Sequence, residues 1–380
     1  MTAESTAFSF DISHRESGTP ARRGKVRTAH GSFQTPAFMP VGTQGAVKGL
    51  QVDEVLATGA EIILANTYHL HLRPGEKLIE SQGGLHEFMT WKGPILTDSG
   101  GYQVFSLSDL RTIDEEGVSF KSHLDGAPCR LSPQIAMEIQ IALGSDIIMS
   151  FDECLPFPCD YDYAAESVDR TTRWEQRTLD FHPRDGRALF GIVQGGVFPE
   201  LRARSAKDLL CLPFDGLAMG GLFVGEPRSE TMDMLQLVAE LIPKHLPRYV
   251  MGVGTPVEVL DCILRGWDMF DCVLPTRNAR HGYALTFAGT VKLKNRRFRE
   301  DSGPLEADCD CMACSRYSRS YLRHLFMSKE QLAGTLLSHH NLRFMQRVMA
   351  GARDAIAHHR LPSFRDEFAR SYEGAVPDDF

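Results

Sequence analysis

The chain has 380 residues, 43% of them hydrophobic and 24% charged, with a formal net charge of -8 at pH 7. This composition is ordinary for a globular protein with a large core. The acidic balance argues against binding of nucleic acid through overall basicity, so such binding needs a local basic patch.

Residues 1–35 are predicted to form an antiparallel segment, a hairpin or small sheet, ahead of the main domain. Short alternating stretches there are punctuated by Gly18, Pro20, Gly24 and Gly31, as is typical of turns between strands. The N-terminal residues lack the charged and apolar regions of a signal peptide, and no apolar run is long enough to span a bilayer. We therefore expect a cytoplasmic protein with no membrane segment.

From residue 36 the chain repeats one unit, an apolar run of strand length followed by an amphipathic helical stretch. The eight runs occupy 37–43, 61–67, 94–98, 146–152, 189–194, 216–221, 248–254 and 269–274. Helices are predicted between them at 133–143, 162–181, 199–210, 229–242 and 256–265. This alternation predicts an α/β fold, a (β/α)8 TIM barrel over residues 36–282. An open doubly wound sheet alternates similarly, but no Gly-x-Gly-x-x-Gly follows the first run.

Further segments extend the predicted barrel. Residues 117–132 contain a short strand, then Asp125-Gly126, then a second short strand, which is a hairpin signature. Residues 283–345 form an insertion after the eighth strand, and 346–380 are predicted to be a helical segment that closes the barrel.

Polar residues stand where several apolar runs end, namely Asp98, Asp152, Gln194 and Asp271. Barrel enzymes carry their reacting groups at this end of the strands. Asp98 and Asp271 can supply the two carboxylates, one nucleophile and one acid/base, that commonly break glycosidic bonds. A single such Asp is more often a helix cap, but four converging strand ends favour a site.

The neighbouring residues favour a purine as ligand. Asp152 and Gln194 together offer an acceptor and an amide for a purine edge, and Gly220, Gly221 and Leu222 supply exposed backbone groups. Tyr102 follows two glycines and offers a flat stacking face. Met251 can pack on a ring, although a core methionine is the more frequent role.

The eighth run leads into Pro275, Arg277 and Arg280, a stiff turn followed by two cations suited to phosphate oxygens. A second basic region lies in the later insertion. It is either the local patch that nucleic-acid binding requires or an ordinary solvated face. Its members are Lys292, Lys294, Arg296, Arg297, Arg299, Arg316, Arg319 and Arg323.

Three of the nine cysteines, Cys309, Cys311 and Cys314, are clustered in that insertion. Nine is an odd number, and the other six are scattered, which indicates a reduced protein rather than a disulfide framework. Three thiolates with one imidazole make a closed tetrahedral zinc shell of the structural kind. The spacing leaves the choice of imidazole open among His324, His339 and His340.

Together these motifs resemble the tRNA-guanine transglycosylase family, in order and over nearly the whole chain. The matching segments are 97–103 (TDSGGYQ), 151–154 (FDEC), 220–222 (GGL), 270–277 (FDCVLPTR) and the clustered cysteines with a later histidine.

The resemblance implies that Asp271 attacks the ribose of a wobble guanosine in tRNA and expels guanine into a covalent enzyme–RNA intermediate. Asp98 then serves as general acid/base. The residues that read the purine are implied to be Asp152, Gln194, Gly221 and Leu222, between Tyr102 and Met251. Those that hold the RNA are Arg277 and Arg280.

The resemblance further implies that Cys309, Cys311, Cys314 and His340 bind one structural Zn²⁺ per subunit and that the enzyme is a homodimer. Cys154 and Val224 resemble the bacterial type, which inserts the prequeuosine base, 7-aminomethyl-7-deazaguanine, in queuosine biosynthesis. One departure is His281, where the family pattern has Asn.

Three alternatives compete with base exchange on tRNA. A nucleosidase or glycosidase shares the two acids but needs no zinc-stapled basic insertion. An RNA-binding protein on an inactive barrel has no reason to keep two costly buried acids. A metal-dependent hydrolase needs ligands at the strand ends, where His69 and His71 are more often structural.

Overall fold

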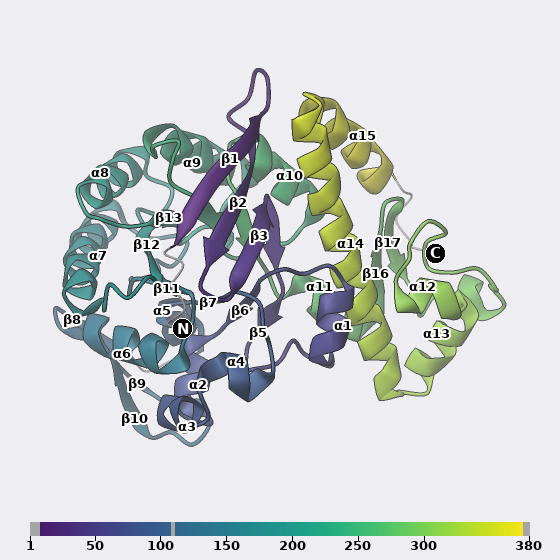
Figure 1. The fold of residues 1–380 in the computed structure, drawn as a ribbon, viewed down its shortest axis with the longest axis horizontal. Helices are drawn as coiled ribbons and strands as arrows, with labels where there is room; N and C mark the ends of the chain where they lie inside the picture. The colour runs from purple at the N-terminus through teal and green to yellow at the C-terminus, as the bar shows by residue number, and fades with distance from the viewer. Residues whose placement is uncertain (1–7, 108–110, 375–380) are drawn as a thin grey trace, which may run out of the picture.

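A sheet of nine parallel strands forms the centre of the molecule in the computed structural model, which describes residues 8–107 and 111–374 (Figure 1). In chain order the strands are β4 (Ala37–Met39), β5 (Val41–Gly42), β6 (Ile63–Ala65), β7 (Ile95–Thr97), β11 (Ile147–Met149), β12 (Ala188–Val193), β13 (Gly216–Met219), β14 (Arg248–Val250) and β15 (Met269–Asp271). Each lies within or overlaps one of the eight predicted runs.

The sheet closes into a barrel through its first segment. β4 and β5 are separated only by Pro40, which has no N–H to donate to the ladder. β4 pairs with β15, the last strand, whereas β5 pairs with β6. The two segments together occupy one of eight positions, and the predicted TIM barrel is confirmed.

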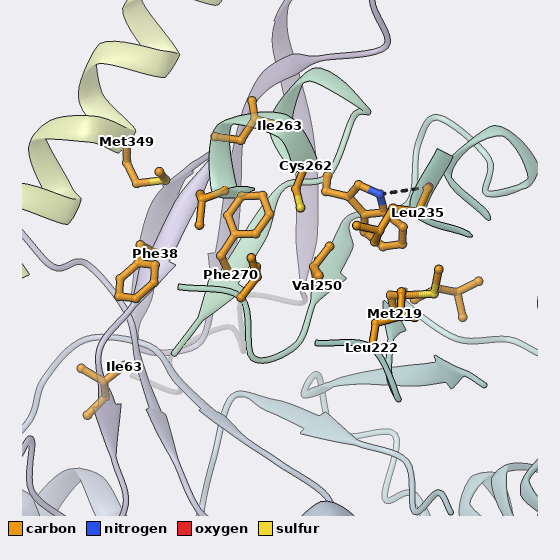
Figure 2. Close-up of a cluster of buried hydrophobic side chains, with 14 of the residues drawn as sticks. Phe38, Ile63, Met219, Leu222, Leu235, Val250, Cys262, Ile263, Phe270 and Met349 are labelled. Atoms are coloured by element: carbon orange, nitrogen blue, oxygen red, sulfur yellow. Dashed lines mark hydrogen bonds between the residues drawn. The ribbon is translucent and has the colours of Figure 1, made fainter. Parts of the chain in front are cut away.

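The strands are buried on both faces, so their side chains divide between two cores. The inner core contains Leu64, Phe190 and Tyr249. The outer core faces the helices, and Figure 2 shows Phe38, Phe270 and Val250 packed in it on the side of Met349 and Ile263. The strands are therefore mostly apolar rather than alternating, and their polar residues Thr97, Arg248 and Asp271 stand at strand ends.

The helices surround this ring. They are α1 (Val52–Ala57), α2 (Thr67–Leu72), α3 (Glu76–Ser81), α4 (Gly84–Met89), α5 (Gly101–Leu107), α6 (Pro133–Leu143), α7 (Tyr161–Phe181), α8 (Pro199–Leu210), α9 (Arg228–Leu241) and α10 (Pro256–Leu264). The bounds of α6 and α8 are those predicted, and Ser132 caps α6 by accepting a hydrogen bond from Ile135 N–H at 3.2 Å.

The N-terminal segment is the predicted antiparallel sheet. Its strands β1 (Ser9–Arg15), β2 (Arg22–Thr28) and β3 (Gly31–Thr35) pair in chain order. Val26 and Phe33 belong to the inner core of the barrel. The sheet therefore covers the end of the barrel where the parallel strands begin. The predictions for residues 1–7 and 375–380 lie outside the described residues.

The hairpin near 117–132 is present but has a third strand that the sequence analysis did not predict. β8 (Arg111–Asp114), β9 (Gly117–Lys121) and β10 (Pro128–Leu131) form an antiparallel sheet in the order β10-β9-β8. The alternation of side chains in β8 covers only four residues. Its pairing with β9 identifies it as a strand.

The predicted extent of the eighth strand, to residue 274, is wrong. β15 ends at Asp271, and α11 (Leu274–His281) begins three residues later with Pro275 in its first turn. Proline is favoured there because the first N–H groups of a helix have no intrahelical partner. Arg277 and Arg280 therefore stand on this helix.

The remaining chain packs beside the barrel. Its elements are β16 (Tyr283–Thr286), β17 (Gly289–Lys292), η1 (Arg296–Arg299), α12 (Met312–Arg316), α13 (Arg319–Met327), α14 (Gln331–Ala357) and α15 (Leu361–Glu373). The long helix α14 lies between the barrel and β16, β17, α12 and α13 (Figure 1). It runs through residue 345, the predicted boundary between the insertion and the C-terminal helical segment. Among the described helices, none is both long and apolar enough to cross a membrane.

Candidate functional site

A cavity of about 510 Å³ opens at the end of the barrel where the strands finish. Its wall combines loops that follow β6, β7, β11, β13, β14 and β15. Most of the predicted site residues line it, namely Asp98, Tyr102, Asp152, Gly221, Leu222, Met251, Asp271 and Arg277. Residues far apart in the chain meet here because the carboxyl ends of parallel strands share one face of a barrel.

Asp98 follows β7 directly and is 7% exposed. One carboxylate oxygen accepts from Thr67 N–H at 2.9 Å, and the other accepts from the side chains of Asn66 and Gln103. Burial, together with the nearby charges of Asp271 and Asp152, raises the pKa of Asp98 to about 7, although the Thr67 and Gly100 N–H groups oppose the shift. A group with this pKa can both donate and accept a proton near neutral pH.

Asp271 is the last residue of β15. Its Oδ1 accepts hydrogen bonds from the Tyr249 hydroxyl at 2.5 Å and from Gly252 N–H at 3.0 Å. Burial raises the pKa of Asp271 above its ordinary value, and these two donors limit the rise. Oδ2 forms no hydrogen bond within the described part of the chain, so one carboxylate oxygen is oriented while the other remains available for a bond to a substrate atom.

Asp152 and Gln194 form a buried pair. Asp152 Oδ1 accepts from Ser99 Oγ at 2.8 Å, and Oδ2 accepts from Gln194 Nε2 at 2.7 Å. Burial raises the pKa of Asp152. Gln194 Oε1 has no partner within the described residues. A Cβ at Gly221 would lie 2.4 Å from this oxygen, so only glycine allows the close approach.

The outer part of the cavity is less polar. Tyr102 is 48% exposed, and its ring lines the opening together with Met251 and Leu222. Cys154 and Val224 also line the wall. Arg277 reaches the cavity from α11, whereas Arg280 is not among the lining residues; its guanidinium donates to Thr276 O on its own helix at 3.0 Å.

The residues that hold the carboxylates were not predicted from the sequence. Asn66 and Gln103 bind Asp98, Ser99 binds Asp152, and Tyr249 binds Asp271. Asn66 stands directly after β6, so the rule used for Asp98 could have identified it. Tyr249 lies within an apolar run and is fully buried, so nothing in the local pattern distinguishes it from a core residue.

The histidines after β6 do not form a metal site with their neighbours. His69 lines the cavity, but His71 pairs with Glu76 at 2.8 Å. Neither belongs to the two groups of potential metal ligands found among the described residues. This arrangement gives no support to the metal-dependent hydrolase.

The first of these groups is Cys309, Cys311, Cys314 and His340, all buried. The three sulfurs lie 3.7, 3.4 and 3.3 Å from His340 Nδ1. Tetrahedral zinc, with bonds of about 2.3 Å to sulfur and about 2.0 Å to nitrogen, separates the two atoms by about 3.5 Å. His340 Nε2 donates to Leu285 O at 2.8 Å, which leaves Nδ1 as the ligand atom. The four residues therefore fit a metal ion, and His340 rather than His324 or His339 completes the set.

The second group, His30, His86 and Asp146, lies at the opposite end of the barrel. The two imidazoles stack with their centroids 3.6 Å apart, and each ring hydrogen-bonds Asp146. Stacked rings aim their nitrogen lone pairs along nearly parallel planes, which does not suit a shared metal ion. We interpret this group as a hydrogen-bonded structural cluster.

The basic region of the later insertion lies around β17, η1, α12 and α13. Arg319 forms an ion pair with Asp301 at 3.0 Å, and Arg323 donates to Asn295 O at 3.0 Å. The exposed members are Lys292, Lys294, Arg296, Arg297, Arg299 and Arg316. These six side chains give an acidic protein a local positive surface.

Comparison with known proteins gives a consistent result. Residues 16–374 match the model of a family described as queuine tRNA-ribosyltransferase. Proteins of that name from Halothermothrix orenii and Pelotomaculum thermopropionicum are each 52% identical to this chain, over 96% and 97% of it and 98% and 100% of their own lengths. The protein of that name from Listeria welshimeri is 51% identical over 98% of this chain and 99% of its own.

Proposed function

Because this chain belongs to the queuine tRNA-ribosyltransferase family, and is therefore an enzyme that exchanges guanine in tRNA, we propose that it works by double displacement. The proposed site is the anticodon wobble position, and the incoming group is the prequeuosine base. The observation that carries the proposal is the convergence of Asp98 and Asp271 on one cavity, each held by neutral donors.

In the first step, a carboxylate oxygen of Asp271 forms a bond to the ribose C1′. The bond between C1′ and the guanine nitrogen breaks, and its electron pair leaves with the base. Tyr249 and Gly252 hold Oδ1 of Asp271, so the carboxylate is oriented before the RNA arrives. The product of this step is an ester between Asp271 and the RNA.

Asp98 supplies the proton transfers. It protonates the departing guanine, then accepts a proton from the incoming base, whose nitrogen attacks C1′ and releases the Asp271 carboxylate. A pKa of about 7 suits both directions, because neither protonation state is scarce at neutral pH.

The base is recognised between the two acids. Asp152 and Gln194 read the edge of the purine with the backbone of Gly221 and Leu222, and Tyr102 and Met251 cover its faces. The unpartnered Gln194 Oε1 and the unmatched charge of Asp152 are the buried polar groups that a purine would satisfy. Cys154 and Val224 line the wall and are proposed to accommodate the aminomethyl substituent, as in the bacterial type.

The RNA is proposed to lie across α11 and the exposed basic region. Arg277 at the cavity and Arg280 one turn further contact phosphates of the anticodon loop, which suits their position on one helix. We also propose that the enzyme is a homodimer, with the cysteine-containing insertion near the subunit contact. A cytoplasmic location follows from the tRNA substrate and the reduced cysteines.

The metal ion is proposed to be zinc, in a structural role. Four protein ligands close the coordination shell and leave no position for a reacting molecule. Removal of the metal with a chelator, or the change Cys314→Ser, is expected to lower the melting temperature and release about one zinc per chain. Metal analysis of the purified protein and a thermal melt measure both. If the molecules that remain folded without metal catalyse exchange at the wild-type rate, the structural role is supported. If the metal-free protein has an unchanged melting temperature, the structural role is contradicted.

The test of the function is exchange of labelled guanine into unmodified tRNA that carries a wobble guanosine, comparing the wild type with Asp271→Asn. Incorporation by the wild type, and its loss in a variant that still binds tRNA, is the expected result. A denaturing gel should reveal a wild-type RNA–protein adduct that the variant cannot form.

Other outcomes of this experiment would support one of the alternative functions. Release of guanine without incorporation, leaving an abasic RNA, points to a hydrolase. Binding of tRNA without either reaction points to an RNA-binding protein. Comparing guanine with 7-aminomethyl-7-deazaguanine as incoming bases tests the proposed base, and a preference for guanine alone contradicts it.

A further inference from the structure

A buried arginine outside the reacting groups supports the floor of the cavity. Arg202 of α8 has no exposed surface. Its guanidinium donates to Gly196 O, Val193 O and Gly220 O, each at 2.8 Å, and to Gly221 O at 3.2 Å. Within the described residues it forms no ion pair with a carboxylate. Burial of an uncompensated charge is unfavourable. A link between two loops could be made by neutral side chains without this desolvation penalty.

The four carbonyl groups belong to two loops at the base-binding wall. Val193 and Gly196 flank Gln194, whereas Gly220 and Gly221 open the loop after β13. Gly195 accommodates the approach of α8, because a Cβ there would lie 2.8 Å from Arg202 N. One guanidinium therefore holds the Gln194 loop and the Gly221 loop in a single arrangement.

The same contacts also fix the direction of two peptide units at the cavity wall. The peptide unit between Gly220 and Gly221 directs its oxygen to Arg202, and its N–H belongs to Gly221, which lines the cavity. The next unit directs Gly221 O to Arg202 and carries the Leu222 N–H. Neither N–H has a protein acceptor within the described part of the chain. A cation at the oxygen end of a peptide polarises the unit and strengthens its N–H as a donor.

We propose that Arg202 is a positioning residue that presents and polarises the Gly221 and Leu222 N–H groups for the negative charge that leaves with the departing base. The inference rests on the proposed function, in which the electron pair of the broken bond moves onto the base. Donors arranged in advance around a developing charge lower the barrier for its formation. Arg202 acts through these peptides and does not touch the substrate.

The test compares two departing bases of different acidity. Guanine is a poorer leaving group than 8-azaguanine, which has the same hydrogen-bonding edge and a more acidic ring N–H. In Arg202→Gln, single-turnover expulsion of guanine from a stem-loop RNA is expected to fall about 100-fold, as for loss of one charge-stabilising donor. Expulsion of 8-azaguanine is expected to fall less than 10-fold, and RNA affinity to stay unchanged.

Arg248 provides a matched control. It is also a buried arginine, and its guanidinium donates to Gly266 O at 3.2 Å and Ile242 O at 2.6 Å, at the opposite end of the barrel. Burial lowers the pKa of both arginines to about 10. Arg248→Gln is expected to lose stability to a similar degree, with less than a 3-fold change in the rate for either base per folded molecule.

Each result has a defined meaning. Equal losses for the two bases in Arg202→Gln, or losses no larger than in Arg248→Gln, overturn the proposal. If Arg202→Gln does not fold, Arg202→Lys is used, because lysine keeps the charge but reaches fewer carbonyl groups. Its loss is expected to be smaller yet still greater for guanine, and equal losses overturn the proposal. A wild-type enzyme that expels no base at all refutes the proposed function instead.

Discussion

Both ends of the barrel contain carboxylates held inside the fold, but the two ends differ in the hydrogen-bond donors that these carboxylates receive. At the end where the strands begin, Asp268 accepts hydrogen bonds from Arg22 Nε at 2.9 Å and Nη2 at 2.6 Å, and also from Arg248 N–H. Asp146 there accepts from His30 and His86. At the other end Asp98, Asp152 and Asp271 receive only neutral donors, and none forms an ion pair within the described residues.

The protonation behaviour follows this difference. Burial alone would raise the pKa of Asp146, but hydrogen bonds from His86, Ile95 N–H and His30 hold it below its ordinary value. Burial without a cation raises the pKa of Asp98 to about 7. The paired end stabilises the fold, whereas the unpaired end costs stability and keeps groups able to exchange protons or form bonds.

The largest expected effect tests the unpaired end. Asp98→Asn should lower the rate of guanine exchange by about 10²- to 10⁴-fold, the usual contribution of a general acid/base. Binding of tRNA, measured by gel shift, should be retained because the change removes only an interior charge. Asp114→Asn, at a hairpin carboxylate paired with Arg130, is the control and should leave exchange unchanged. A loss below 10-fold in Asp98→Asn would exclude the acid/base role.

The second prediction tests the paired end. Asp268→Asn leaves the guanidinium of Arg22, 1% exposed, without a counter-charge. The free energy of unfolding should fall by about 3–5 kcal/mol, the cost of breaking a buried pair. Urea denaturation measures it, and exchange per folded molecule should be unchanged. Glu87→Gln, which breaks the exposed pair with Lys92, should have no measurable effect. Equal effects in the two variants would remove the distinction between buried and exposed pairs.

The third prediction concerns the pH dependence of stability. The folded-state pKa of Asp98, about 7, exceeds its ordinary value of about 3.9. Its contribution to stability is therefore present below pH 4 and lost as pH rises through 7. Relative to the wild type, Asp98→Asn should gain up to about 4 kcal/mol between pH 4 and pH 8, from about 1.4 kcal/mol per pKa unit.

Asp146→Asn should show the opposite trend. The pKa of Asp146 is lowered in the folded protein, so its contribution is present above the ordinary value and lost as pH falls. The variant should be less stable than the wild type at neutral pH and approach it below pH 4. Urea denaturation from pH 3 to 8 compares both variants, and slopes of the same sign would refute the contrast.

The sequence by itself was sufficient for the barrel and for most of the cavity wall. Strands buried on both faces must be apolar throughout, and each run ends where the backbone leaves the sheet and polar residues become acceptable. Asp98, Asp152 and Asp271 can be identified from the sequence for this reason. Three thiols within six residues likewise indicate a metal site without knowledge of the fold.

Only the tertiary structure decided the partners of these residues. His340 completes the cysteine set because α14 places it, rather than His339, against the three sulfurs. Tyr249 and Arg202 look like core or helix residues in the sequence, and their roles follow from contacts 22 and 18 residues away along the chain. A residue type and its neighbours set local structure, but the energy of a buried charge depends on atoms that the fold brings from elsewhere.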